Sequence, residues 1–150
     1  MPEACDTIEF YGAGPHETYI DRVSGAPVGV YKQSVDDQFW PLYARPQECG
    51  AHCSLRWWRV TDSAGRGFEV VSDNLFQANA LPYEQSQFDI LSKNNRKFAQ
   101  DLTTDGNTYI NIDLAQQGLG CVNSWKAVPR AEYLVLYRDV EFNFVLRPLK

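Results

Sequence analysis

Trp125 is the residue whose type and position most suggest a binding role in this chain. It ends the stretch Gly118-Leu119-Gly120-Cys121-Val122-Asn123-Ser124-Trp125, which is rich in small residues and follows an alternating apolar pattern. A tryptophan on such a loop can pack down as a lid. It can also stack its apolar face on the CH groups of a sugar ring while the indole N–H donates one hydrogen bond. The residue types alone leave both interpretations open.

A second candidate stretch, residues 11–22, reads Tyr-Gly-Ala-Gly-Pro-His-Glu-Thr-Tyr-Ile-Asp-Arg. Gly12 and Gly14 permit backbone angles with positive φ, and Pro15 stiffens the following step. Polar side chains that could reach a ligand, or one another, come next: His16, Glu17, Asp21 and Arg22. The alternative is an ordinary strand connection with solvated charges, and composition alone favours it because Gly-Pro turns are common on surfaces.

No motif for independent catalysis is recognisable in the sequence. Glycosidic cleavage needs two carboxylates roughly 5 to 10 Å apart, and scattered acids such as Glu17, Glu48 and Glu84 do not reveal such a pair. Gly12-Ala13-Gly14 lacks the third glycine and the βαβ pattern of a dinucleotide fingerprint. We therefore expect no catalytic residue in this chain.

The cysteines and histidines do not follow a metal-site pattern. Cys49 and Cys53 flank His52, whereas Cys5 and Cys121 are isolated. Structural zinc sites use closely spaced ligand pairs. Free, partly buried thiols and no metal are the expectation.

Length and charge exclude several classes of protein. The chain has 150 residues, 44% of them hydrophobic, and a net charge of −5, which fits one globular domain with its own core. Nucleic-acid binding would need clustered Lys and Arg, which are absent from the sequence. No apolar run reaches the roughly 18 to 20 residues of a membrane span, and the first residues lack a signal-peptide pattern. We expect a soluble protein without a membrane or nucleic-acid partner, in a cytoplasmic or periplasmic location that stays open.

Alternation with a period of two dominates the chain and predicts β-strands. Strands are expected at residues 7–11, 28–35, 54–61, 68–71, 76–81, 109–114, 132–137 and 140–147, the last with its apolar side facing a core. Residues 63–67 and 104–107 have the composition of hairpin connections. One short helix is expected from Pro82 to about Leu91. The pattern predicts a single domain over residues 1–150, an all-β antiparallel sandwich with at most one short helix.

Two adjacent tryptophans, Trp57 and Trp58, lie in one of these expected strands. Successive side chains of a strand point to opposite faces, so one tryptophan should lie in the core and the other on the far face. Bulky aromatics on both faces indicate a sheet that packs against something further.

Three of these stretches together resemble the C-terminal part of the large bacterial β-galactosidases of glycoside hydrolase family 2. Residues 11–22 resemble the family's Gly-x-Gly-Pro-x-Glu-x-Tyr-x-Asp-Arg, residues 43–48 its Tyr-x-x-Pro-x-Glu, and residues 118–125 its Gly-x-Gly-Gly-Asp-Asp-Ser-Trp. Their order and spacing fit along nearly the whole chain, so the resemblance is specific. The sequence departs from the family at His16, at Cys49, and at Cys121-Val122-Asn123 in place of Gly-Asp-Asp.

The resemblance implies the fold of the family's last domain, an antiparallel super-sandwich similar to galactose mutarotase. In the family that domain is longer, so residues 1–150 would form its C-terminal half. The catalytic barrel, with its acid/base and nucleophile glutamates and its magnesium and sodium sites, lies upstream. The chain would therefore be an inactive part of a retaining β-galactosidase that hydrolyses terminal β-D-galactose residues, as in lactose, and would hold no cofactor itself.

The resemblance also implies roles for particular residues. Trp125 would be a sugar-stacking platform, with Ser124 and Asn123 beside it. Residues 12–22, which we name the rim loop, would be mobile near the sugar, with Gly14 as a hinge-like position. Its other implied members are Gly12, Glu17, Asp21 and Arg22. Of these, Glu17, Asp21 and Arg22 would support the loop or contact another domain. The implied partners are a β-galactoside sugar, the upstream domains, and further copies of the full-length protein in a homo-oligomer.

Two other functions remain open from the sequence. A free-standing carbohydrate-binding module would use exposed Trp and Tyr side chains as its whole site. A mutarotase-like epimerase is suggested only by analogy of fold, and it would need a general acid and base, for which only His16 and His52 are available.

Overall fold

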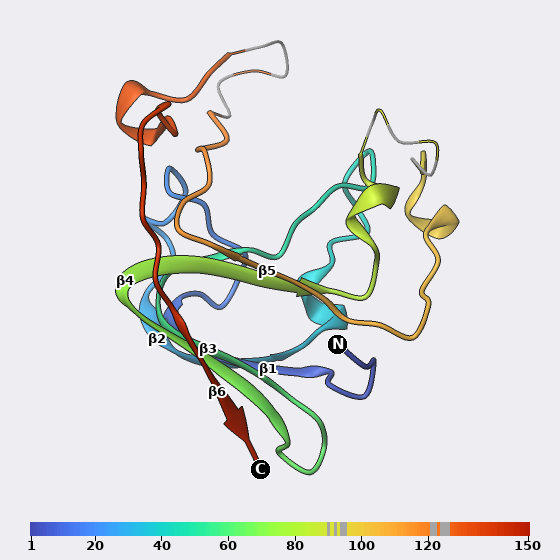
Figure 1. The fold of residues 1–150 in the computed structure, drawn as a ribbon. Helices are drawn as coiled ribbons and strands as arrows, with labels where there is room; N and C mark the ends of the chain where they lie inside the picture. Colours follow the sequence, from blue (N-terminus) through green and yellow to red (C-terminus); the bar gives the residue numbers. More distant parts are fainter. Residues whose placement is uncertain (90, 92, 94–95, 121–122, 124–126) are drawn as a thin grey trace.

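The computed structural model describes residues 1–89, 91, 93, 96–120, 123 and 127–150. These residues form one antiparallel sheet of six strands, shown in Figure 1: β1 (Thr7–Ala13), β2 (Val28–Ser34), β3 (His52–Thr61), β4 (Gly67–Leu81), β5 (Tyr109–Asp113) and β6 (Val145–Leu149). Short 3-10 turns lie between them: η1 (Asp36–Gln38), η2 (Gln85–Gln87), η3 (Ala99–Asp101) and η4 (Ala131–Tyr133). The predicted all-β antiparallel class is confirmed, and the sheet is consistent with a β-sandwich.

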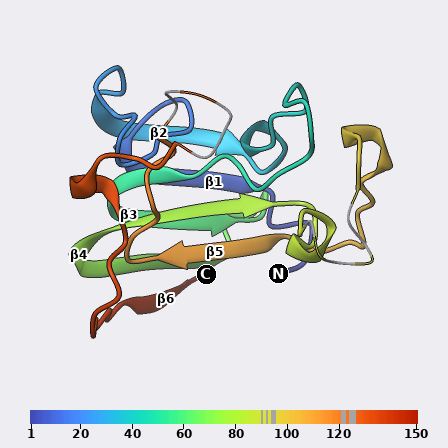
Figure 2. The ribbon, with the colours of Figure 1, turned by 90° about the horizontal axis from the view of Figure 1, so that it is seen from above.

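The strands lie in the order β2-β1-β3-β4-β5, and β6 also pairs with β4 (Figure 2). β4 has 15 residues, and this length gives it two partners on one edge. Its second part, Gln77–Leu81, pairs with β5, and its first part, Gly67–Val71, pairs with β6. The sequence predicted two separate strands here. They form one strand because residues 72–75 contain neither Gly nor Pro to end it.

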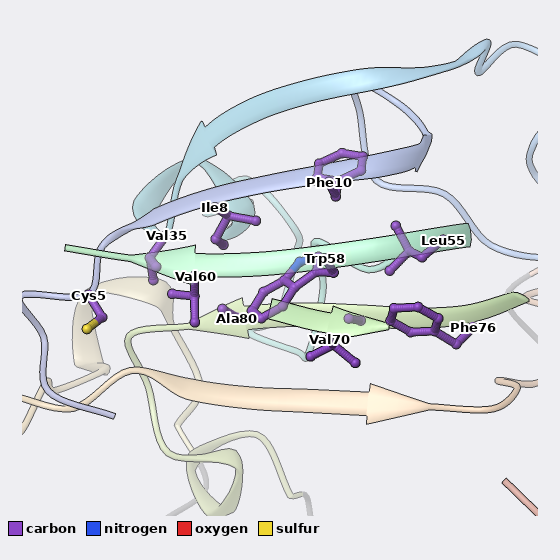
Figure 3. Packing of buried hydrophobic residues seen from close by; sticks show 11 residues of the cluster. Cys5, Ile8, Phe10, Val35, Leu55, Trp58, Val60, Val70, Phe76 and Ala80 are labelled. Carbon is purple, nitrogen blue, oxygen red and sulfur yellow. The ribbon is translucent and has the colours of Figure 1, made fainter. Parts of the chain in front are cut away.

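The core lies on one face of the sheet, where alternate residues of neighbouring strands meet. Phe10 of β1 is opposite Trp58 of β3, and Trp58 is opposite Val70 of β4. All three side chains are fully buried, and Figure 3 shows them packed with their neighbours. Trp57 points to the opposite face, where the Arg59 guanidinium lies 4.8 Å from its ring centroid. The predicted division of the two tryptophans between the faces is confirmed.

Both strands predicted after residue 130 differ from the structure. Residues 132–137 contain part of η4 and no strand, and Leu136 and Tyr137 are exposed. Strand β6 starts only at Val145, and Val140, Phe144 and Leu146 are exposed rather than turned to the core. Among the apolar residues of this segment, Phe142 does pack against the core cluster. Alternation was a poor guide because a strand also needs a neighbouring strand to pair with.

Two shorter elements also differ from their predictions. The helix expected from Pro82 to about Leu91 is reduced, in its described residues, to the single turn η2. The Gln87 side chain at the end of η2 bonds to the backbone of Thr103 through both its oxygen and its nitrogen, at 3.0 and 2.8 Å, which fixes the turn on the following segment. Residues 62–66 form the β3–β4 hairpin as predicted. Residues 104–107 instead turn the chain from η3 into β5, and Asn107 bridges to Pro2.

Among the described residues, no helix has the length and apolar character that a membrane crossing requires.

Candidate functional site

Glu17 joins the first motif to the second. β1 ends at Ala13, and the chain then brings Glu17 beside residues 43–50. The backbone N–H of Gly50 donates to Glu17 Oε2 at 3.0 Å, and the Tyr43 hydroxyl donates to Oε1. The Tyr19 hydroxyl donates to Oε2 at 3.4 Å. With only 14% of its side chain exposed, Glu17 is an internal junction of the rim loop rather than a solvated charge.

The two tyrosines at this junction act as hydrogen-bond donors. Burial, followed by the neighbouring Glu17 charge, raises the pKa of Tyr19 well above its usual value. Burial and the hydrogen bond to Glu17 raise the pKa of Tyr43 to about 12. Both hydroxyls therefore keep their protons at neutral pH and can satisfy the Glu17 carboxylate.

Arg22 lies at the outer side of the same junction. Its Nη1 lies 3.4 Å from Glu17 Oε1, and 57% of its side chain is exposed. Its backbone N–H donates to the Tyr19 carbonyl at 2.7 Å, which closes a turn at the end of the rim loop. An exposed ion pair of this kind stabilises little, so the guanidinium stays available to other acceptors.

Asp21 joins the first motif to the third. Its Oδ1 accepts from the Leu119 N–H at 3.0 Å, and its Oδ2 accepts from the Gly120 N–H at 2.8 Å. Gly118 packs on the carboxylate so closely that an added Cβ would lie 2.7 Å from it. Desolvation opposes ionisation of Asp21, but the Gly120 and Leu119 N–H groups outweigh it and lower its pKa.

The third motif is described only in part. The Gly118 N–H donates to the Tyr133 carbonyl at 2.9 Å, and Gly120 has a positive φ of 76°. Asn123 is exposed. Trp125 and Ser124 lie outside the described residues, so the sugar platform stays a prediction.

Gly12 and Gly14 are placed differently from the prediction. Neither has a positive φ, and Gly12 lies within β1 rather than in a connection. A Cβ on Gly12 would lie 2.6 Å from Leu55 Cδ2, and one on Gly14 would lie 2.7 Å from the Tyr31 ring. The two glycines are thus needed for close packing. The peptide bond between Gly14 and Pro15 is cis.

A carboxamide network that sequence reasoning missed holds the second motif on the sheet. Asn79 of β4 and Asn111 of β5 are opposite each other, and Asn111 Nδ2 donates to Asn79 Oδ1 at 2.8 Å. Asn79 Nδ2 donates to the Cys49 carbonyl at 2.8 Å. A buried asparagine between apolar strand residues was the available signal, because a buried amide requires partners.

Glu48 completes this network beside a cavity of about 430 Å³. The Gln85 side chain donates to Glu48 Oε2 at 2.6 Å. Burial, and then the charge of Asp113, raises the pKa of Glu48. The polar groups of this cavity mostly bond to one another, which fits a role in holding residues 48–50 in place.

A second cavity, of about 370 Å³, lies between the rim loop and the segment after η1. Its lining includes His16, Arg22, Asp37, Trp40 and Tyr43. His52 also lines it, although it is only 1% exposed, with Nδ1 3.2 Å from the Ala13 carbonyl. Burial lowers the pKa of His52 to about 4, so the imidazole is neutral at pH 7. Such a buried, bonded histidine is poorly placed to exchange protons with a sugar.

We expect Asp21→Ala to loosen the third motif without unfolding the sheet. The substitution removes two charge-assisted acceptors and should cost about 1–2 kcal/mol. The amides of Leu119 and Gly120 should then exchange with deuterium faster than in the parent chain. Asp62→Ala is the matched control, since Asp62 accepts from the Ala64 and Arg66 N–H groups at 2.9 Å in the β3–β4 turn. Equal acceleration at residues 119 and 120 in both variants would contradict the local role.

The same contact should be sensitive to acid. Because the folded pKa of Asp21 lies below the ordinary value near 3.9, its stabilising contribution is complete above that value. It is lost as the pH falls through the lowered folded pKa. The amide proton shifts of Leu119 and Gly120 should therefore titrate only below about pH 4. A midpoint at pH 5 or above would argue against the assigned hydrogen bonds.

Comparisons with known proteins point to one family. A family described as "Beta galactosidase small chain" matches residues 1–146. A β-galactosidase of Priestia megaterium is 36% identical over 150 residues, which cover 99% of this chain and 14% of that protein. The β-galactosidases of Lactobacillus delbrueckii subsp. bulgaricus and Streptococcus thermophilus are 30% and 31% identical, over 99% and 95% of this chain and 14% of each relative. The chain thus spans about one seventh of the length of these relatives, and it belongs to the beta-galactosidase small chain family.

Proposed function

We propose that this chain is the C-terminal β-sandwich portion of a β-galactosidase, the C-terminal half of its last domain, and forms one wall of its sugar site. The observation that supports this most directly is the pair of junctions at Glu17 and Asp21. Glu17 ties the rim loop to Gly50, and Asp21 ties it to Leu119 and Gly120. Hydrogen bonds thereby join three motifs that lie far apart in the sequence.

In this proposal the chain binds and orients the sugar but does not cleave it. Trp125 stacks on the β-galactoside, with Ser124 and Asn123 beside it, and Asp21 holds the start of their loop. Glu17 and Arg22 support the rim loop. The acid/base and nucleophile glutamates of a retaining hydrolase, with magnesium and sodium, belong to the upstream domains, which are the proposed partners in a homo-oligomer.

No metal-dependent step is assigned to this chain. Among the described residues, no three His, Cys, Asp or Glu side chains gather in a group that could hold a metal ion. Cys5, Cys49 and Cys53 are buried free thiols, and the Cys49 thiol donates to the Gln38 carbonyl at 3.6 Å. These groups contribute packing and hydrogen bonds.

The proposal is tested by a chimera in which this chain replaces the aligned 150-residue segment of the Priestia megaterium β-galactosidase. We expect the chimera to hydrolyse a nitrophenyl β-galactoside. Trp125→Ala should raise KM about fivefold, because one aromatic stacking contact is worth about 1 kcal/mol. Tyr137→Ala, which alters a ring that is fully exposed in the isolated chain, is the control and should leave KM unchanged. An active chimera whose KM is insensitive to Trp125→Ala would refute the platform role.

The isolated chain separates this proposal from a free-standing carbohydrate-binding module. A wall of a larger site should bind lactose weakly, with a Kd on the order of millimolar or more, and should not hydrolyse the nitrophenyl substrate. Micromolar binding that Trp125→Ala abolishes would favour the module instead. Catalysed mutarotation of an aldose by the chain would favour the epimerase.

A further inference from the structure

We infer that the 370 Å³ cavity beside the rim loop is a saccharide subsite, in which the indole of Trp40 is an aromatic platform. The inference deepens the proposed function, since it adds a second aromatic contact for the same class of ligand. It stands on described residues alone. The volume is within the range of about 300–1,000 Å³ that small-molecule sites occupy.

The local structure directs Trp40 outward. Phe39, the preceding residue, is extended and packs inward, with its ring centroid 5.0 Å from that of Tyr83 and 6.2 Å from that of Phe88. Successive side chains of an extended segment point to opposite sides. The Trp40 side chain therefore points away from this aromatic cluster, and the residue is 53% exposed.

The backbone at Trp40 is also anchored. Its N–H donates to the buried Cys49 Sγ at 3.3 Å, and Pro41 follows with a restricted φ. The backbone that carries the platform is thus anchored before a ligand arrives, which lowers the entropy cost of binding. A half-exposed indole held in this way, on the wall of a cavity, is the arrangement that stacks on a pyranose face.

Polar side chains, an acidic and a basic one among them, line the same cavity as Trp40. Asp37 Oδ2 accepts from the Ser34 N–H at 3.1 Å and from its hydroxyl at 2.8 Å, and these bonds lower the pKa of Asp37. Neither of these bonds uses Asp37 Oδ1. Arg22 supplies an exposed donor, and His16 is exposed as well. Sugar hydroxyls both donate and accept, so an acceptor and a donor around one aromatic face suit a pyranoside.

Different residues of the rim loop contact this cavity and the loop that begins at Gly118. None of the described residues of that loop, 118–120 and 123, lines the cavity. Arg22 lines it, whereas the preceding Asp21 holds Leu119 and Gly120. A pyranoside in the cavity should be registered by the signal of Trp40 itself, so the two tryptophans are monitored independently.

The test uses the chain labelled with 5-fluorotryptophan, which gives one fluorine NMR signal for each of its four tryptophans. Single Trp→Phe variants assign the signals. On titration with lactose to several hundred millimolar, the Trp40 signal should shift with saturation, while that of the fully buried Trp58 should stay fixed. Sorbitol, which has hydroxyls but no pyranose face, should leave Trp40 unmoved.

Substitutions then locate the subsite. Trp40→Ala should raise about fivefold the lactose Kd that is fitted from the amide shifts of His16 and Asp37. Tyr137→Ala should leave this Kd unchanged. A Trp125 shift without a Trp40 shift would overturn this inference and leave the proposed function standing. A Trp40 shift without a Trp125 shift would support the subsite and count against the Trp125 platform. If neither signal moves, or if sorbitol moves Trp40 equally, the subsite is refuted.

Discussion

Replacing Gly50 by alanine is expected to destabilise the fold by about 3–5 kcal/mol. Gly50 has a φ of 75°, which strains any residue with a Cβ, and an added Cβ would lie 2.2 Å from the backbone oxygen of Gln38. Any shift that relieves the clash also pulls the Gly50 N–H from Glu17. Urea unfolding monitored by circular dichroism measures the loss.

Two other glycines separate the causes of that loss. Gly65 has a φ of 80° but open space around its Cβ position, so Gly65→Ala should cost only the backbone strain, about 1–2 kcal/mol. Gly25 has open space and no such φ, so Gly25→Ala should change stability by less than about 0.5 kcal/mol. If Gly50→Ala costs no more than Gly65→Ala, the contact with Gln38 is not tight and the account of Gly50 is wrong.

Removing the Glu17 carboxylate is the second change with a large expected effect. Glu17→Ala leaves the Gly50 N–H and the hydroxyls of Tyr19 and Tyr43 without their acceptor in a partly buried place. Leaving such donors unpaired should cost about 2–4 kcal/mol. Glu17→Gln keeps the shape and one acceptor oxygen but places an amide beside other donors, so it should recover only part of that stability.

Glu9→Ala is the matched control for Glu17. Glu9 also pairs with an arginine, Arg59, at 2.7 Å, but both side chains are about one third exposed. Its loss should cost less than about 1 kcal/mol. The amide resonance of Gly50 should move in Glu17→Ala and stay in place in Glu9→Ala. Similar unfolding curves for the two alanine variants would show that Glu17 is no junction.

The sequence alone was sufficient to predict strands whose own residues alternate between the core and the opposite face. The alternation of Ile8 and Phe10 in β1, and of Trp58 and Val60 in β3, was readable because each set turns one face to the core. Residues 132–147 alternate just as clearly, yet Val140 and Phe144 are exposed. The sequence of a segment does not show whether the folded chain supplies a strand to pair with it or a core to bury its apolar side.

The sequence predicted which side chains of the candidate site matter, but it did not predict the groups that they bond to. The resemblance singled out Glu17 and Asp21 as supporting residues. Asp21 accepts from the backbone N–H groups of Leu119 and Gly120, and one partner of Glu17 is the Gly50 N–H. Every residue but proline has such a group, so no residue type marks these partners. Asn79 and Asn111 were missed because each is an ordinary polar residue until the pairing of β4 and β5 sets them opposite each other.

The junction at Asp21 also bears on the order of folding. It joins residues that are 98 and 99 positions apart, and the Glu17–Gly50 contact spans 33. Contacts this distant carry a large loop-closure entropy, so we expect them to form after the local hairpin of β3 and β4 has organised the sheet. We expect the proposed sugar-binding surface to be assembled late, once β5 has docked, so that an incompletely folded or incompletely synthesised chain would lack the proposed site.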